Sequence, residues 1–374
     1  MRFSSAHIKQ QLLRHILDGH YKPGQKLPTI SELSQILQVS TKTVQKAIHA
    51  LSADGLIAAK PRVGLTVIAP PPLAIRSRCI GLFHLHPPKY LKQGPYPKSV
   101  IDAAQHELKK AGYTLSPCSL VELDRLNLVS SISKKHLSGA LLFELDSDPL
   151  ILELREARLP MVSMDYDAYR HGLSSVLFDN LHGTFQATKR LIAAGHRRIA
   201  FLRPLVKNVF SNSNSLDWIE DLRMNGYRLC MLDAGLTPVV LEYENDRPAA
   251  HALLVNVFAH RPAPTALVCT ADWSALVIAQ VVQQLGFRIP ADLSVVGFGD
   301  ARAEFAPGQF LSSVHADYAS MGRQGARLLL NALQGEQARR EILPVKVVDY
   351  DSIGVLPSES ANRANESGAV VAAK

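Results

Sequence analysis

The sequence has few cysteines and no long apolar run. Its 374 residues include four cysteines, and no two are close enough in sequence for a metal knuckle or a redox pair. No spacing suggests a disulfide framework, so we expect buried thiols in a reducing compartment. Nowhere do about 18 apolar residues follow one another, and the N-terminus lacks the apolar stretch of a signal peptide. We therefore expect a cytoplasmic protein without a membrane span.

Motifs that carry catalysis are also missing. The sequence has no phosphate-binding P-loop, no HExxH zinc motif and no GxSxG nucleophile elbow. The run 297–302 begins like a dinucleotide-binding loop, but it lacks the third glycine and stands late in the chain. We therefore expect a protein that is not an enzyme and uses neither a metal ion nor a cofactor.

Excess positive charge is present at one end of the chain only. The formal net charge is +8; residues 1–78 contain 11 Lys or Arg and 3 Asp or Glu, whereas the rest contains 30 of each. Such asymmetry is expected where one small domain meets a polyanion. The plainer alternative is a surface that only keeps the protein in solution.

The start of the chain follows the pattern of three helices and a hairpin. Apolar residues at helical spacing predict a helix over 5–18, a second from near Thr29, and a third from Thr41. Two short β segments follow at 56–59 and 65–68, separated by a turn with a glycine. This order predicts a winged helix-turn-helix domain over residues 1–68.

The third predicted helix has a polar face that suits contact with DNA, although an ordinary solvated face is the alternative. Lysine pairs with phosphate or guanine, glutamine can bridge adenine, and threonine reaches phosphates or thymine methyl groups. Basic residues also flank the predicted tip of the wing. The predicted DNA-contacting residues are Thr29, Thr41, Lys42, Thr43, Gln45, Lys46, Lys60 and Arg62.

Residues 5–68 resemble the winged-helix head of the GntR family. The matching pieces are Pro23-Gly24, Leu27-Pro28, Glu32-Leu33, Val39-Ser40, Thr43-Val44, Leu51, Gly55-Leu56 and Gly64. The resemblance implies a homodimer on palindromic operators in double-stranded DNA, with the third helix in the major groove and the wing at the minor groove. The family usually has arginine where this chain has Ser31, Thr41 and Gln45, and lysine elsewhere on the helix does not reproduce arginine's bidentate fork.

A proline-rich boundary separates this head from an α/β pattern. Residues 69–78 contain three consecutive prolines and predict a semi-rigid linker. Short apolar runs then alternate with helical stretches over 79–357, which is typical of parallel sheets covered by helices. The small, polar residues 358–374 predict a disordered tail. The expected strands are 79–85, 139–143, 161–164, 175–178, 199–202, 266–269 and 293–297, and the expected helices are 97–111, 180–194, 217–234, 272–285 and 319–334.

This core is similar to the effector domains of the lactose- and galactose-repressor (LacI/GalR) type. The runs that carry the similarity, in order, are VLFDNLHGTFQATKRLIAAGHRRIAFL, DLRMNGYRLCMLDAGLTP, PTALVCTADWSALVIAQVVQQLGFRIPADLSVVGFGDARAEF and MGRQGARLLLNAL. The similarity implies a two-lobed, periplasmic-binding-protein-like type I fold with a small-molecule effector, usually a sugar or a nucleobase, between the lobes. The implied lobes are about 79–178 with 316–334, and 179–315 with 335–357. Arabinose-repressor-like regulators combine such a head and core.

Five residues are expected in the interlobe cleft: the resemblance implies Arg223, Asp272 and Asp300, and the residues themselves suggest Trp273 and His86. Arg223 matches an arginine that holds ligand hydroxyls, and a surface helix charge is its alternative. Asp272 could instead cap its helix, Asp300 could fix a turn, and Trp273 could fill the core in place of stacking on a sugar. His86 follows the first strand, at the edge of a parallel sheet where ligands bind.

Two ligand groups of the resembled family are replaced. Ala271 stands at the asparagine of an Asn-Asp pair, and Gly299 stands at the first acid of an Asp-Asp pair. The amide and the carboxylate that hold sugar hydroxyls are therefore absent. We hypothesise a ligand other than a common hexose or pentose, or a cleft that no longer binds one. The chain is interpreted as a transcription regulator, a repressor by the commoner arrangement, sensing a sugar or sugar derivative; the alternative is a cytoplasmic sugar-sensing protein without a DNA-directed function.

Overall fold

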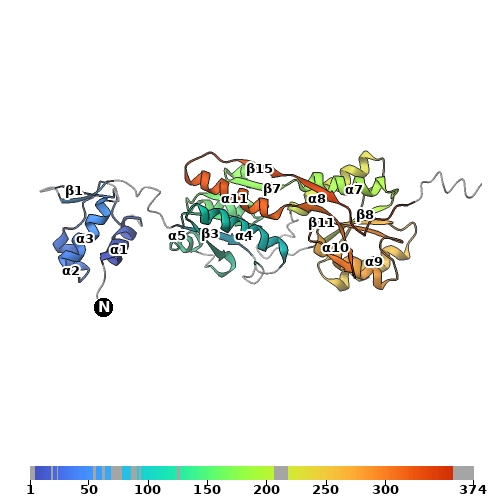
Figure 1. Cartoon of the computed structure of the whole chain (residues 1–374), viewed down its shortest axis with the longest axis horizontal. Helices are drawn as coiled ribbons and strands as arrows, with labels where there is room; N and C mark the ends of the chain where they lie inside the picture. Colours follow the sequence, from blue (N-terminus) through green and yellow to red (C-terminus); the bar gives the residue numbers. More distant parts are fainter. Residues whose placement is uncertain are drawn as a thin grey trace, which may run out of the picture. The chain divides into compact units, whose positions relative to one another are not determined.

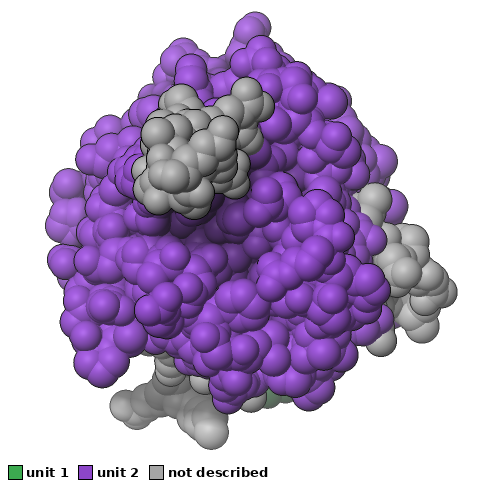
Figure 2. All heavy atoms as spheres, turned by 90° about the vertical axis from the view of Figure 1, so that its right-hand side faces the viewer, with its two compact units in different colours: residues 1–78, 136–138 green, residues 79–135, 139–374 purple. Residues whose placement is uncertain are grey.

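The chain divides into two compact units (Figure 1). A computed structural model describes residues 5–17, 20–22, 24–53, 56–60, 64–68, 78–85, 91, 94–123, 127–205 and 218–356. The first unit contains residues 1–78 with 136–138, and the second contains 79–135 with 139–374, as coloured in Figure 2. The predicted linker (69–78, except Arg78) and the predicted tail (358–374) lie outside the described residues. No helix among the described residues is long and apolar enough to cross a membrane.

The first unit, called the head below, has the predicted three helices and hairpin. Its elements are α1 (Ser5–Leu17), α2 (Ile30–Ile36), α3 (Thr41–Ala53), β1 (Ile57–Lys60) and β2 (Gly64–Val67). The two strands pair antiparallel. The apolar sides of all five elements share one buried cluster, which includes Ile8, Leu12, Leu33, Val44, Ile48, Leu51, Ile57 and Val67. The polar side of α3 is therefore left facing outward.

Thr29 caps α2. Its Oγ1 accepts a hydrogen bond from the Glu32 amide at 3.3 Å, and its own amide donates to Glu32 Oε2 at 2.7 Å, which completes a capping box. The Glu32 carboxylate also accepts a hydrogen bond from the Thr29 hydroxyl at 3.0 Å, and its pKa is lowered by the bond from the Thr29 amide first and by that from the hydroxyl second. Thr29 was predicted to contact DNA, and its hydroxyl is engaged here in holding the start of the helix.

We expect Thr29→Ala to weaken α2, because it removes the hydroxyl that caps the helix; a DNA contact by Thr29 stays a prediction. Loss of a threonine cap costs about 1 kcal/mol, so amide hydrogen exchange in α2 of the whole protein should accelerate about fivefold. Thr29→Ser keeps the hydroxyl and is expected to retain the protection. Equal exchange in wild type and the alanine variant would contradict the capping role.

The second unit, called the core below, contains two sheets of six strands each. The first sheet has the order β15-β7-β6-β5-β3-β4, and all its neighbouring strands are parallel. Its strands are β3 (Cys79–His84), β4 (Thr114–Ser119), β5 (Gly139–Phe143), β6 (Met161–Met164), β7 (Ser174–Phe178) and β15 (Arg340–Leu343). The helices of this first lobe are α4 (Pro95–Lys110), α5 (Leu128–Ser133), α6 (Asp148–Arg155) and α11 (Tyr318–Leu333), with 3-10 turns at Leu120–Glu122 and Tyr169–His171.

The second sheet has the order β16-β14-β11-β10-β8-β9, and only β16 runs antiparallel to its neighbour. Its strands are β8 (Ile199–Leu205), β9 (Val239–Glu244), β10 (Ala266–Cys269), β11 (Ser294–Gly299), β14 (Ser312–Ala316) and β16 (Val345–Val348). The helices of this second lobe are α7 (Asn180–Ala193), α8 (Trp218–Asp233), α9 (Arg247–Ala259) and α10 (Asp272–Gln284), and β12 (Glu304–Ala306) with β13 (Gln309–Phe310) forms a small separate ribbon.

The chain crosses between the lobes three times. It passes from β7 to α7, from β14 to α11, and from β15 to β16. The predicted lobe boundary is wrong in one place, because residues 335–357 were assigned to the second lobe. Arg340–Leu343 instead pairs in parallel with Ser175–Phe178 in the first sheet. After α11 the chain adds one more strand to the first lobe before it crosses for the last time.

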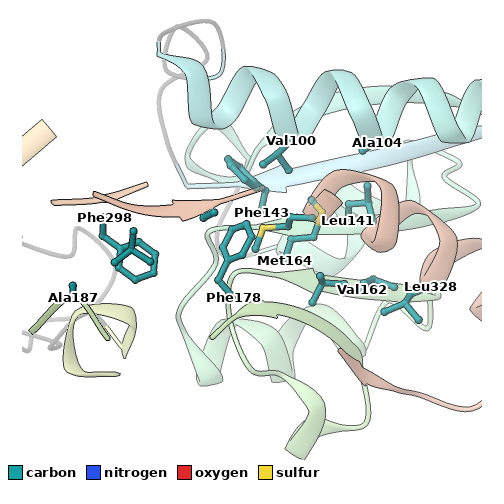
Figure 3. Close-up of a cluster of buried hydrophobic side chains, with 14 of the residues drawn as sticks. Val100, Ala104, Leu141, Phe143, Val162, Met164, Phe178, Ala187, Phe298 and Leu328 are labelled. Carbon is teal, nitrogen blue, oxygen red and sulfur yellow. The ribbon is translucent and has the colours of Figure 1, made fainter. Parts of the chain in front are cut away.

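One apolar cluster extends through both lobes. Val100, Phe143 and Phe178 belong to its part in the first lobe, and Ala187 and Phe298 belong to its part in the second (Figure 3). A separate cluster fills the other face of the second sheet beneath α9 and α10. Aromatic rings therefore stand where the strands of both lobes end.

Candidate functional site

The exposed face of α3 carries four of the predicted DNA-contacting residues. Thr41, Lys42, Gln45 and Lys46 are exposed, whereas the opposite side of the helix is buried in the core of the head. Thr43 is half-buried, and its hydroxyl lies 2.8 Å from that of Ser40 at the start of the helix. Two lysines and two hydrogen-bonding side chains thus form one surface that can meet phosphates and base edges.

Three predicted site residues cannot be placed. The side chain of Lys60, the whole of Arg62 and the whole of His86 lie outside the described residues. The contribution of the wing to DNA binding and that of His86 to an effector site therefore stay predictions.

Arg223 lies on α8 at the carboxyl ends of the second-lobe strands. Its Nε donates to Asn180 Oδ1 at 2.8 Å, and its Nη1 donates to the carbonyl oxygen of Thr270 at 2.6 Å. The guanidinium carbon lies 3.8 Å from the centre of the Phe298 ring, within the range of a cation–π interaction. The interpretation of Arg223 as a plain surface charge is therefore wrong, because neighbouring groups orient its guanidinium.

Asp272 joins β14 to the segment that follows β11 and does not cap its helix. Ala271 takes the N-cap position of α10. The buried Asp272 carboxylate accepts one hydrogen bond from the Ser313 hydroxyl and one from the Ala301 amide, both at 2.6 Å. Burial is the main cause that raises the pKa of this carboxyl, and the two hydrogen bonds oppose it.

Asp300 follows β11 with a positive φ of 52°. Its Oδ2 lies 2.8 Å from His315 Nδ1, and its Oδ1 accepts a hydrogen bond from the Tyr350 hydroxyl at 3.0 Å. The backbone conformation and these contacts agree with a role in fixing the turn.

Trp273 lies at the surface of the core. Its side chain is 50% exposed, so the interpretation that it fills the core is wrong.

Tyr318, which the sequence analysis missed, comes from the first lobe and reaches Gly299 in the second. A Cβ atom built at Gly299 would lie 2.2 Å from the Tyr318 hydroxyl oxygen, so no side chain fits there while Tyr318 keeps its position. Burial is the main cause that raises the pKa of the Tyr318 phenol, followed by the Asp272 charge, and Arg223 opposes them. The phenol is thus neutral at ordinary pH, and its neighbours include two predicted effector residues.

Aromatic side chains of the first lobe surround Tyr318. The Tyr96 ring centre lies 4.6 Å from that of Tyr318, and the Phe178 ring centre lies 6.0 Å away. Tyr96 also donates a hydrogen bond of 2.6 Å to Asp165. A second contact between the lobes pairs Tyr166 with Trp218, 5.6 Å between ring centres. The site therefore combines aromatic rings with one oriented guanidinium. Among the described residues, no group of three or more His, Cys, Asp or Glu could hold a metal ion.

Two family models match the chain, one in the head and one in part of the core. Residues 4–67 match the model of bacterial regulatory proteins of the gntR family, and residues 188–353 match the model of a periplasmic binding protein-like domain. A similar curated protein is the arabinose metabolism transcriptional repressor of Geobacillus stearothermophilus, 26% identical over 353 residues, which are 87% of this chain and 90% of that protein. Another is the HTH-type transcriptional repressor PurR of Proteus mirabilis, 24% identical over 85% of this chain and 94% of that protein. Both are named as repressors and neither as an enzyme.

Solved structures show the same fold. A complex of the transcriptional regulator CelR with cellobiose has a TM-score of 0.64 at 23% identity, covering 87% of this chain and 100% of that one. The lac repressor dimer bound to operator and an anti-inducer has a TM-score of 0.62 at 20% identity, covering 75% and 96%. The α/β core with parallel sheets and the helix-turn-helix head agree with the fold expected from the sequence.

Proposed function

Because this chain joins a gntR-family helix-turn-helix domain to a periplasmic-binding-protein-like effector domain, we propose that it is a transcription repressor. It binds an operator as a homodimer and responds to a small organic molecule held between the lobes of the core. It acts in the cytoplasm, where the DNA is. One relative is named for arabinose metabolism, and a similar solved structure is a complex with cellobiose; both favour a sugar or sugar derivative as the effector.

The exposed face of α3 carries this proposal. It presents Lys42, Lys46, Gln45 and Thr41 on a helix whose other side is locked into the core of the head. All of the formal net charge belongs to the same end of the chain. Lysines on such a face release counterions from the phosphates, and glutamine and threonine can read base edges.

Control by the effector requires two states of the core. A ligand shifts their balance only through a difference in its affinity for them. Residues from both lobes meet around Tyr318 and Gly299, so a ligand there would contact both lobes and could favour one arrangement of them. Because the spacing of operator half-sites is fixed, a modest change in the spacing of the two heads of a dimer would weaken DNA binding.

We expect Lys42→Ala and Lys46→Ala to lower operator affinity and to flatten its salt dependence. Each lysine that neutralises a phosphate contributes about 0.9 to the slope of log affinity against log salt concentration. Gel retardation at several salt concentrations, with fragments from the region upstream of the protein's own gene, measures this slope. Lys109→Ala, an exposed lysine on α4, is the control and should leave the slope unchanged.

Two outcomes would contradict the proposal. An unchanged slope in both α3 variants would remove these lysines from the interface. No retardation of any upstream fragment beyond that of unrelated DNA, by a folded protein that still binds a sugar, would favour the sensing protein without a DNA-directed function.

A further inference from the structure

The carboxylates at the ends of the second-lobe strands already have partners. Asp272 uses both oxygens for Ser313 and Ala301, and Asp300 uses both for His315 and Tyr350. The side chains of Asp272 and Asp300 are also largely shielded from solvent. A neutral polyol presents hydroxyl donors that need accessible acceptors, and carboxylates that are shielded from solvent and already hydrogen-bonded recognise it less well.

Glycine at position 299 leaves the site without the carboxylate acceptor that the resembled family has there. Its φ of 129° lies in a region that L side chains rarely adopt, and the Tyr318 hydroxyl takes the space a side chain would need. A phenol from the first lobe thus stands where the resembled family has an acid from the second. This exchange replaces a charged acceptor with a neutral hydroxyl on an aromatic ring.

Arg223 brings a positively charged side chain to the same group of residues at the ends of the second-lobe strands. The acceptors of its two hydrogen bonds are an amide oxygen and a backbone carbonyl oxygen, neither of them charged. None of the described carboxylates forms an ion pair with Arg223, although Asp272 is near enough for their charges to interact. A guanidinium held by neutral groups is matched by an incoming anion, and its planar fork suits a carboxylate.

We propose that the interlobe site takes a ring-bearing carboxylate, bound through Arg223 with its ring against Tyr318. This inference rests on the proposed function and specifies its effector. Sugar acids and aromatic acids share this chemistry, because a sugar ring and a benzene ring both present faces that pack on an aromatic side chain. Tyr318 is the residue that sets the specificity, since it supplies the ring and leaves no room for an acid at position 299.

Matched pairs of compounds test the need for the negative charge. Thermal unfolding of the whole protein is followed with D-galacturonate against D-galactose, and with benzoate against benzamide. The charged member of at least one pair is expected to raise the unfolding temperature, and its neutral partner is not. The pair that responds distinguishes a sugar acid from an aromatic acid. The proposal is overturned if neither carboxylate has an effect, or if D-galactose, benzamide, L-arabinose or cellobiose stabilises the protein as strongly.

Variants test the two residues with whichever carboxylate binds. Arg223→Gln is expected to weaken its binding at least about tenfold, and Arg223→Lys, which keeps the charge without the fork, is expected to weaken it less. Tyr318→Phe keeps the ring and should stay within about threefold of wild type, whereas Tyr318→Leu should lose about tenfold. Wild-type affinity in Tyr318→Leu would remove Tyr318 from the site. DNA retardation by the same ligand-free variants reports separately on the proposed function, so a failed ligand test with intact DNA binding overturns only this inference.

Discussion

Gly226→Val is expected to destabilise the core severely and to abolish the response to an effector. A Cβ atom at position 226 would lie 2.1 Å from the carbonyl oxygen of Leu181 and 3.0 Å from its carbonyl carbon. Both are backbone atoms of α7, so the clash is relieved only by moving one helix away from the other. Forcing a larger side chain into such tightly packed backbone lowers the free energy of unfolding by about 3 kcal/mol or more.

The higher helix propensity of valine relative to glycine does not reverse this expectation. Most residues favour a helix over glycine by up to about 1 kcal/mol, which is smaller than the cost of separating two packed helices. The functional consequence follows because α8 carries Arg223 and α7 begins with its hydrogen-bond partner Asn180. Thermal unfolding and ligand-induced release of DNA measure both effects.

Asn225→Ala is the matched control for Gly226. Asn225 is the preceding residue of α8 and is exposed, so its replacement is expected to leave the unfolding temperature nearly unchanged. Wild-type stability in Gly226→Val would show that α7 and α8 do not approach as closely as the structure has them.

Arg203→Met is expected to produce the second large loss of stability. The Arg203 side chain is 3% exposed and contacts Asp221 at 2.8 Å, Glu242 at 3.5 Å and Glu220 at 3.7 Å. Methionine fills a similar volume but removes the cation that Arg203 brings to the buried Glu220 carboxylate. Removing one partner of a buried ion pair costs about 3–5 kcal/mol, which denaturant unfolding of the whole protein would detect.

A second variant separates charge from packing at this site. Arg203→Met combined with Glu220→Gln is expected to recover part of the loss, because a buried carboxylate that has lost the Arg203 cation is made neutral. Arg340→Met is the control, since that arginine pairs with Asp167 at the surface, where an ion pair contributes about 1 kcal/mol or less. A loss at Arg203 no larger than at Arg340 would contradict the importance of burial.

The sequence predicted most of the interior strands, but it missed the four edge strands and one interior strand, β14, whose residues 312–316 (SSVHA) do not form an apolar run. The ranges 139–143, 161–164 and 266–269 match β5, β6 and β10 residue for residue. The strands β4, β9, β15 and β16 stand at the four ends of the two sheets, and none was predicted. A central parallel strand is buried on both faces and reads as a continuous apolar run. Most residues of the edge strands are exposed or half-buried, and β4 contains Pro117, so their segments resemble loops.

The candidate site could be predicted only in part, because some of its contacts form between residues that are far apart in the sequence. Arg223, Asp272 and Asp300 lie in motifs of the resembled family, and the structure brings all three into the electrostatic surroundings of Tyr318. The contact between Gly299 and Tyr318 depends on how two lobes meet, and no spacing along the chain reports it. The glycine was therefore interpreted as a lost ligand group, whereas the structure shows a hydroxyl from the other lobe in its place.

The threefold crossing of the chain between the lobes has a consequence for how such proteins can be rearranged. Each lobe of the core is assembled from separated segments, so no single cut in the gene releases an intact lobe. A truncation after α11 would strip β15 and β16 and leave β7 and β14 as open edges that invite pairing between molecules. The helices and strands of the head, in contrast, lie in one uninterrupted stretch before β3. Recombination can exchange the helices and strands of the head as one segment, whereas the two lobes of the core depend on the whole stretch from β3 to β16.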